Sequence, residues 1–279
     1  MNYRHSYHAG NFADVVKHVI LIRLIKSFLV KDTGFQVLDI HAGIGLYDLA
    51  CDETQKSREY EHGVAKLIPA MLDTESETIA TYLTIIKHYN SSLHLSYYPG
   101  SPMITDQLLR PQDKLILCEL HPHDHKLLKL QCHQSDNDIA IHHMDGYLAL
   151  KAFLPPKLKR GLVLIDPPFE TPNEFERVTQ GITTVLPRWR NGVFMVWLPL
   201  KNTYNVNKFY AALKTLSLTY TTIEFTLPAL KIANQLSACS IVIINPPWLV
   251  ADDLAQTILP LLAQALDAQW TIKTMHANK

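Results

Sequence analysis

An excess of charge of either sign is absent from this sequence, in which Lys and Arg together number 26 and Asp and Glu also number 26. No field over the whole surface would steer the chain to nucleic acid, so any such binding must use a local patch. Cysteine is also scarce. The four cysteines are far apart and form no C-x-x-C pair, which argues against a disulfide framework and a zinc knuckle. We therefore expect a protein of the reducing cytoplasm.

Long apolar runs are missing as well. The most apolar early stretch is residues 15–30, and Lys, His and Arg side chains interrupt it, so we expect no membrane span. The polar and aromatic N-terminus does not resemble a signal peptide. Hydrophobic residues nevertheless make up 47% of the 279 residues and charged ones 19%, which suits a sizeable core and excludes a largely disordered chain. We expect one domain, residues 1–279.

Short apolar runs alternate with helical patterns along most of the chain, which is typical of an α/β fold with a doubly wound, mostly parallel sheet. The last two runs follow each other without a helix, and we expect them to form an antiparallel hairpin at one edge of the sheet. The apolar runs predict seven strands, at residues 36–42, 114–120, 139–145, 161–167, 192–200, 221–227 and 238–245.

One stretch does not fit a strand–helix–strand unit. About 70 residues separate the first two predicted strands, and residues 52–94 contain helical patterns only. The second of these predicted helices begins with the capping-box pattern Thr74-x-x-Glu77. We therefore predict an inserted helical subdomain over residues 52–94, beside any ligand site at the end of the first strand.

Acidic residues and glycines stand at the ends of the first four predicted strands, where ligands bind in sheets of this kind. The first strand runs into a G-x-G turn at Gly43 and Gly45, a weak signal by itself. The third glycine of a dinucleotide fingerprint and a Gly-Lys-Ser/Thr phosphate loop are both absent, so a nucleoside without a pyrophosphate fits better than NAD. Glu119 could then accept from ribose hydroxyls and Asp145 from an adenine amino group, although each acid could instead cap a helix.

The fourth predicted strand ends in Asp166-Pro167-Pro168-Phe169. An exocyclic amine on adenine is a poor nucleophile because its lone pair is delocalised into the ring. The Asp166 carboxylate and the Pro167 carbonyl can each accept one N–H, which favours a tetrahedral nitrogen with its lone pair aimed at an electrophile. Phe169 offers a face for base stacking. The matching electrophile is the methyl group of S-adenosylmethionine; the bland alternative is a Pro-Pro loop stop with a chance acid.

A second copy of this pattern, Asn245-Pro246-Pro247-Trp248, also follows an apolar strand. Because that strand is the last of the seven, we expect it at the sheet edge, far from the glycine turn. We interpret this copy as a strand terminus with Trp248 in the core.

The chain resembles the ribosomal large-subunit methyltransferase J family nearly end to end. The family N6-methylates an adenine of 23S rRNA, adenine 2030 in the usual numbering. The N-terminal string from Asn2 to His18 is the most specific part of the resemblance. It continues in His41-Ala42-Gly43, Tyr97-Tyr98-Pro99-Gly100-Ser101-Pro102, Glu119-Leu120-His121-Pro122, Asp145-Gly146, Leu164-Ile165-Asp166-Pro167-Pro168 and Ile244-Asn245-Pro246-Pro247-Trp248.

The resemblance implies a Rossmann-like class I methyltransferase fold with an inserted helical subdomain. Asp166 is by resemblance the catalytic acceptor, and the family often has Tyr where Phe169 stands here. Tyr3, Arg4 and Lys17 are expected to contact the RNA substrate. The S-adenosylmethionine site implied by the resemblance and by the glycine turn comprises Lys17, His18, His41, Gly43, Ser101, Glu119, Asp145, Gly146 and Asp166.

Other interpretations remain open from the sequence. Residues 3–5 could be a flexible tail, and Lys17 and His18 could lie on the solvated face of the first helix. We expect no metal site, because a loop entering a helix explains the histidine-rich segment 121–125. The chain could also be a DNA adenine methyltransferase or a non-catalytic RNA-binding assembly factor. We favour a cytoplasmic monomer acting on free or early-assembly 23S rRNA.

Overall fold

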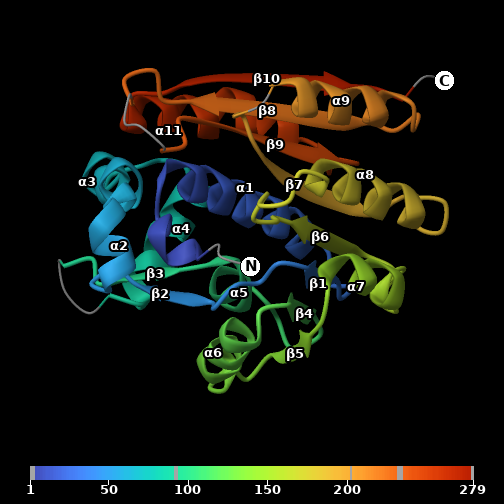
Figure 1. Cartoon of the computed structure of the whole chain (residues 1–279), viewed down its shortest axis with the longest axis horizontal. Helices are drawn as coiled ribbons and strands as arrows, with labels where there is room; N and C mark the ends of the chain where they lie inside the picture. The colour runs from blue at the N-terminus through green and yellow to red at the C-terminus, as the bar shows by residue number, and fades with distance from the viewer. Residues whose placement is uncertain (1–3, 91–93, 202, 231–234, 278–279) are drawn as a thin grey trace.

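An eight-stranded sheet lies at the centre of the molecule, in the order β10-β8-β9-β7-β6-β1-β4-β5 (Figure 1). The computed structural model describes residues 4–90, 94–201, 203–230 and 235–277. The strands of this sheet are β1 Gln36–Asp39, β4 Lys114–Glu119, β5 Asp138–His143, β6 Gly161–Ile165, β7 Val193–Pro199, β8 Tyr220–Thr226, β9 Ala238–Ile244 and β10 Gln269–Met275.

Five strands of the sheet, β5, β4, β1, β6 and β7, run parallel to one another. The first strand, β1, lies in the interior: β4 pairs with one side of it and β6 with the other. The chain therefore winds outward from β1 in both directions, which confirms the predicted doubly wound α/β fold. The switch point of such a sheet lies beside β1, and the carboxyl ends of its neighbours open onto the same crevice.

The other three strands differ in part from the prediction. β8 and β9 form the expected antiparallel hairpin, but β9 also pairs antiparallel with β7 and so lies inside the sheet, not at its edge. The sheet has eight strands where seven were predicted, because β10 adds to β8 at the outer edge. The burial of β10 alternates between exposed and half-buried residues, so it lacks the continuous apolar run that marked the other strands.

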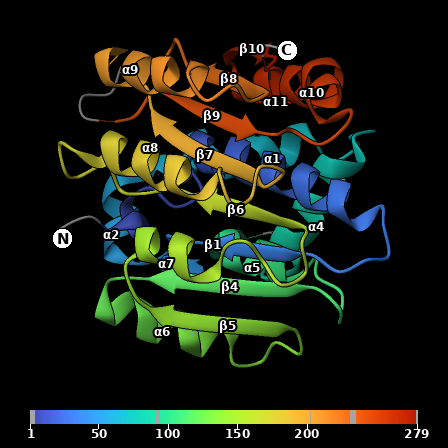
Figure 2. The same cartoon turned by 90° about the vertical axis from the view of Figure 1, so that its right-hand side faces the viewer.

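Helices cover both faces of the sheet, and the sheet separates two hydrophobic cores (Figure 2). One core is closed by α1, α4, α5, α6 and α11, and the other by α7, α8 and α9. These helices are α1 Phe12–Leu29, α4 Glu77–His88, α5 Ser101–Asp106, α6 Pro122–Cys132, α7 Gly146–Phe153, α8 Glu174–Val185, α9 Thr203–Lys214 and α11 Leu259–Leu266. Two short segments come directly before α11, the helix α10 Val250–Asp253 and the π-helical turn Leu254–Ile258. None of the helices in the described part of the chain is long and apolar enough to cross a membrane.

Residues 52–94, where we predicted an inserted helical subdomain, contain α2 Asp52–Ser57, the 3-10 turn η2 Glu59–His62, α3 Val64–Ala70 and α4. A two-stranded ribbon of β2 Leu46–Asp48 and β3 Tyr97–Pro99 flanks them. They pack on the rest of the molecule, α4 against α1 and α3 against α11. The predicted capping box is wrong: Ser76, not Thr74, is the N-cap of α4, and its hydroxyl accepts from the backbone N–H of Ile79.

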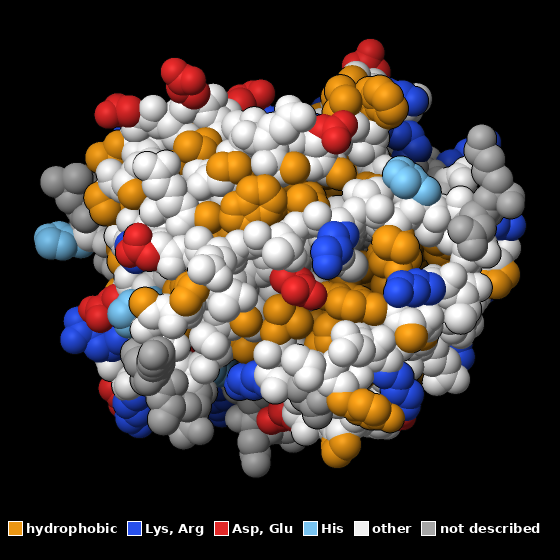
Figure 3. Space-filling model, turned by 90° about the horizontal axis from the view of Figure 1, so that it is seen from above, with side chains coloured by type: hydrophobic (Ala, Val, Ile, Leu, Met, Phe, Trp, Pro, Cys, Tyr) orange, Lys and Arg blue, Asp and Glu red, His pale blue; other side chains and the backbone are white. Residues whose placement is uncertain are grey.

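The face seen from the side of β10 and α9 carries hydrophobic side chains near its middle and scattered charges around them (Figure 3). On β10 itself, apolar residues such as Trp270 and Ile272 occupy alternate, half-buried positions. An outer strand of this kind has one face to pack and one edge without a partner strand, which explains its weak sequence signal.

Gly63 gives a test of how η2 and α3 are joined to the N-terminal segment. A Cβ at this position would lie 2.1 Å from the carbonyl oxygen of Gly10 and 2.4 Å from the carbonyl carbon of Asn11. Because both atoms are backbone, we expect Gly63→Ala to lower the free energy of unfolding by about 2 kcal/mol or more, measured by urea denaturation.

The matched control is Gly181→Ala in α8, where the nearest atoms to the new Cβ are side-chain atoms, Leu150 Cδ1 at 2.8 Å and Tyr147 Cδ1 at 3.1 Å. These side chains can move, and alanine is the better helix former, so we expect a smaller loss. Equal losses in the two variants would contradict the close approach at Gly63.

Candidate active site

A cavity of about 550 Å³ opens at the carboxyl ends of the parallel strands, beside β1. Its wall contains every predicted site residue that the structure describes. Tyr3 lies outside the described residues. The predicted residues in the wall are Arg4, Lys17, His18, His41, Gly43, Ser101, Glu119, Asp145, Gly146, Asp166, Pro167 and Phe169.

The glycine turn after β1 is tied to the end of β4. Gly43 has a φ of 63°, and a Cβ on it would lie 2.4 Å from the Tyr47 hydroxyl oxygen, so the turn requires glycine. The Gly43 N–H donates to Oε2 of Glu119 at 2.9 Å, and the His121 N–H donates to Oε1 at 2.7 Å. Burial raises the pKa of Glu119. Its carboxylate thus positions two loops as well as lining the cavity.

A buried carboxylate that was not among the predicted site residues lies under this turn. Asp39, the last residue of β1, accepts from the Ser101 hydroxyl at 2.6 Å and from the His41 N–H at 3.1 Å. Burial raises the pKa of Asp39 to about 6, because the carboxylate loses water. Burial likewise lowers the pKa of His41 to about 4. The neutral ring of His41 then accepts from the Asp166 backbone N–H through Nδ1, at 3.3 Å.

Asp145 takes part in a second network at the end of β5. It is the N-cap of α7, where Oδ1 accepts from the Tyr147 N–H, and its Oδ2 accepts from Arg177 at 2.6 Å. The guanidinium of Arg177 also lies over the Tyr147 ring, 4.4 Å from its centroid. Asp145 therefore caps a helix, as the alternative interpretation proposed, and also lines the cavity. Arg177 and Tyr147, which were not among the predicted site residues, line the cavity as well.

Lys17 and Asp166 form an ion pair across the cavity wall, with 2.5 Å between Nζ and Oδ2. Lys17 is only 4% exposed and His18 only 1%, so the solvated-face alternative for these two residues is wrong. His18 Nδ1 lies 2.7 Å from the Tyr98 hydroxyl, and burial holds the pKa of His18 well below its usual value. The first turns of α1 thus bring polar groups beside Asp166 in the cavity wall.

The loop after β6 places an aromatic ring beside Asp166. Phe169 has a φ of 50°, an uncommon backbone conformation for a residue other than glycine. Its ring centroid lies 4.7 Å from that of Phe175 and 5.9 Å from that of Trp197. Trp197 comes from β7 and also lines the cavity. An aromatic wall therefore stands next to the carboxylate.

The second Pro-Pro copy does not belong to the cavity. Our expectation that Trp248 lies in the core is wrong, since its side chain is 86% exposed. The copy lies outside the cavity because β9 runs antiparallel to β7, which puts the carboxyl end of β9 beside the amino ends of the parallel strands. Asn245 donates through Nδ2 to the carbonyl oxygens of Arg190 and Gly192 and so fastens a turn.

The histidine-rich segment is accounted for within the described residues. His121 is the N-cap of α6, and its Nδ1 accepts weakly from the Asp124 N–H. His125 and His143 stack with ring centroids 5.1 Å apart. In the described part of the chain, no group of three or more His, Cys, Asp or Glu residues is arranged to hold a metal ion.

A family model and two curated relatives of this chain are described as ribosomal RNA large subunit methyltransferases. A family model described as "Ribosomal RNA large subunit methyltransferase D, RlmJ" matches residues 32–276. The chain is 36% identical to Ribosomal RNA large subunit methyltransferase J of Escherichia coli, over 95% of this chain and 94% of the relative. It is 35% identical to the Haemophilus influenzae protein of the same name, over 98% of both. The crystal structure of protein LPL1258 from Legionella pneumophila is 33% identical, with a TM-score of 0.89 over 98% of this chain and 99% of that one.

Asp39 gives a pH-dependent test of the site. Its pKa is about 6 in the folded protein against 3.8 as the ordinary value, so the wild type loses stability as the pH rises from 4 through 6. The side chain introduced by Asp39→Asn cannot ionise, and its amide can still bond the Ser101 hydroxyl, which rotates to accept. We expect the variant to gain roughly 2–3 kcal/mol on the wild type between pH 4 and pH 8, in urea unfolding at each pH. A difference that does not change with pH would contradict the raised pKa.

Proposed function

We infer the activity of this chain from its family: the chain belongs to the ribosomal RNA large subunit methyltransferase RlmJ family. It is therefore a methyltransferase of the Rossmann-like class I type, it uses S-adenosylmethionine, and its substrate is large-subunit ribosomal RNA. We propose that the methyl acceptor is N6 of an adenine, adenine 2030 by the family resemblance. The observation that supports this most directly is that Asp166-Pro167-Pro168-Phe169 lines the cavity at the end of β6.

The cavity suits S-adenosylmethionine in volume. A volume of about 550 Å³ lies in the ordinary range of small-ligand sites. A Cβ on Gly146 would lie 2.2 Å from the Ile40 carbonyl oxygen, so glycine keeps this part of the wall close to β1. When bound, S-adenosylmethionine supplies an electrophilic methyl group on sulfur.

We propose that the nucleoside end is held at the ends of β4 and β5. Glu119 would accept from the ribose hydroxyls and Asp145 from the adenine amino group. Both oxygens of Asp145 already accept one hydrogen bond, but a carboxylate oxygen has two lone pairs, so each can accept another. His18, His41, Gly43, Ser101 and Gly146 would complete the wall.

The target base is proposed to enter from the side of Asp166. Oδ2 of Asp166 accepts from Lys17, and Oδ1 has no donor among the described residues, so Oδ1 is the oxygen that would accept one N–H of the amine. The Pro167 carbonyl would accept the other, which turns the nitrogen lone pair away from the ring and toward the methyl group. Phe169, with Trp197 beside it, would stack on the flipped base.

The remaining expectations belong to the same proposal. Arg4, which is exposed at the lip of the cavity, and Tyr3 would contact the RNA, together with Lys17. We propose a monomer that acts in the cytoplasm on free or early-assembly rRNA. A DNA adenine methyltransferase and a non-catalytic assembly factor remain the alternatives that experiment must exclude.

Asp166→Ala tests the reaction. We expect methyl transfer to fall by a factor of at least about 100, because the amine loses its main acceptor, while the affinity for S-adenosylmethionine stays within about threefold. Transfer of a labelled methyl group to 23S rRNA transcripts and to plasmid DNA measures activity, and calorimetric titration measures affinity. Transfer to DNA only would favour the first alternative, and cofactor-free RNA binding would favour the second. Undiminished turnover in the variant would remove the basis of the mechanism.

The two Pro-Pro-aromatic copies provide a matched pair. Phe169→Ala removes a base-stacking face, worth about 1–3 kcal/mol, so we expect kcat/KM for rRNA to fall by roughly 5- to 150-fold. Trp248→Ala removes an exposed aromatic ring outside the cavity and should leave kcat/KM within twofold. Steady-state kinetics on the same transcript compare them. A larger loss in Trp248→Ala than in Phe169→Ala would reverse the assignment.

A further inference from the structure

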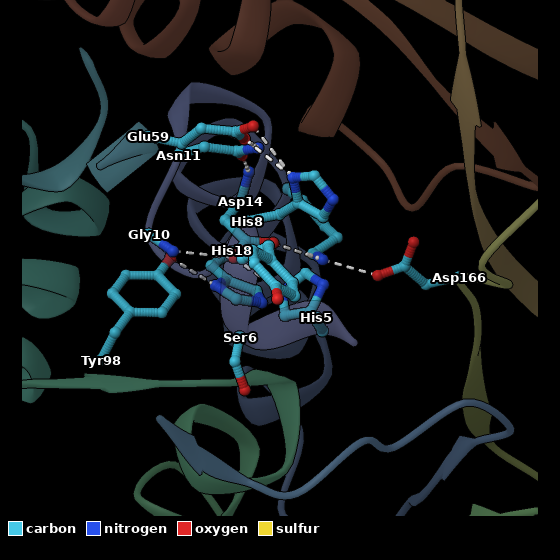
Figure 4. Close-up of polar contacts among 12 residues, drawn as sticks. His5, Ser6, His8, Gly10, Asn11, Asp14, His18, Glu59, Tyr98 and Asp166 are labelled. Carbon is cyan, nitrogen blue, oxygen red and sulfur yellow. Dashed lines mark hydrogen bonds and ion pairs between the residues drawn. The ribbon is translucent and has the colours of Figure 1, made fainter. Parts of the chain in front are cut away.

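The carboxylate of Asp14 is the point at which the N-terminal segment and the catalytic motif meet (Figure 4). It lies in the first turn of α1 and is only 2% exposed. Oδ1 accepts from Lys17 Nζ at 2.7 Å. Oδ2 accepts from the Gly10 backbone N–H at 3.0 Å and lies 2.9 Å from His5 Nε2. The two oxygens thus have different partners.

The Oδ1 side leads to the reaction centre. Lys17 reaches Asp14 with the same ammonium group that reaches Asp166 Oδ2 at 2.5 Å. Burial by itself lowers the pKa of Lys17, but the two carboxylates outweigh burial and raise it above its usual value. Asp14 therefore draws a charged ammonium to one place, and that place fixes which oxygen of Asp166 is left for substrate.

The Oδ2 side leads to the segment that precedes α1. Residues 5–7 form the 3-10 turn η1 (His5–Tyr7), directly after Arg4 at the lip of the cavity. A second buried carboxylate, Glu59 of η2, holds the same segment by accepting from Asn11 Nδ2 at 2.9 Å and by contacting His8 Nδ1 at 3.0 Å. Asp14 and Glu59 thus both hold this segment, and Asp14 also contacts Lys17.

Capping of α1 does not by itself account for the contact between Asp14 Oδ1 and Lys17. Asn11 already caps α1, accepting from the Asp14 N–H at 2.9 Å, and the helix buries an apolar surface along most of its length. Taking a carboxylate and an ammonium out of water costs several kcal/mol each, and their attraction does not reliably recover that cost. The Gly10 N–H needs an acceptor at this position, but a neutral amide oxygen could serve as well as a carboxylate.

We infer that Asp14 is a positioning residue for methyl transfer, aiming Lys17 at Asp166 through Oδ1 and holding the RNA-contacting N-terminal segment through Oδ2. This inference rests on the proposed function. Asp14 acts on substrate only through Lys17 and His5, so removing its charge should impair turnover and RNA use while leaving cofactor affinity in place.

Asp14→Asn tests the inference because it keeps the shape of the side chain and removes its charge. At saturating rRNA and S-adenosylmethionine we expect kcat to fall by roughly 10- to 100-fold, the size expected for misplacement of a catalytic group. The KM for rRNA should rise at least threefold, and the dissociation constant for S-adenosylmethionine should stay within threefold. The control is Asp253→Asn. This change breaks an ion pair between Asp253 of α10 and Arg23, which lies on α1 like Asp14 but outside the cavity, and it should keep kcat within twofold.

A double-mutant cycle separates positioning from loss of structure. If Asp14 acts through Lys17, Asp14→Asn should lower kcat less than twofold when it is added to Lys17→Met. The inference would be overturned if Asp14→Asn lowered kcat by the same factor in the wild type and in Lys17→Met. It would also be overturned if Asp14→Asn alone left kcat unchanged. A wild type that transfers no methyl group to rRNA would overturn the proposed function and this inference with it, whereas an active wild type with an equally active Asp14→Asn overturns the inference alone.

Discussion

The ion pair between Lys17 and Asp166 joins α1 to the end of β6, and the site is arranged around it. It spans 149 residues of sequence and closes at 2.5 Å in a largely buried place. Two charges removed from water must be held by further partners, and Asp14 supplies one of them to Lys17. The ring of His41, just before the glycine turn, accepts from the Asp166 backbone N–H. The first helix, the glycine turn and the loop after β6 are therefore linked by polar contacts.

Much of the fold could be predicted, because the parallel strands are buried on both faces and so appear as short apolar runs. That holds for β1, β4, β6 and β7. The prediction failed for the places of β9 and β10 in the sheet. Nothing local in 238–245 indicates that β9 inserts between β7 and β8, and the half-exposed alternation of β10 is too weak to separate from a loop. The cap at Thr74 failed for a smaller reason, since Ser76 competes with it two residues later.

The candidate site was predictable to the extent that topology alone places residues together. The carboxyl ends of parallel strands meet at one edge, so Glu119, Asp145 and Asp166 could be grouped from their positions after apolar runs. Their partners could not. Arg177 reaches Asp145 from a helix 32 residues on, and Glu59 reaches Asn11 across 48 residues. Such contacts have no periodic signature, although the three-residue spacing of Asp14 and Lys17 on one helix was a signal that could have been used.

The two Pro-Pro-aromatic segments show why a motif needs a place in the sheet before it has a chemistry. Both follow buried strands and both end in an aromatic side chain. β6 runs parallel to β1, so its motif arrives at the edge where the glycine turn and the polar end of α1 lie. β9 runs the other way, and its motif lies at the opposite end of the strands. There the Asn245 side-chain amide donates to the backbone of a turn, and Trp248 faces solvent. Strand direction, which no single motif encodes, thus separates a loop that lines the cavity from one that does not.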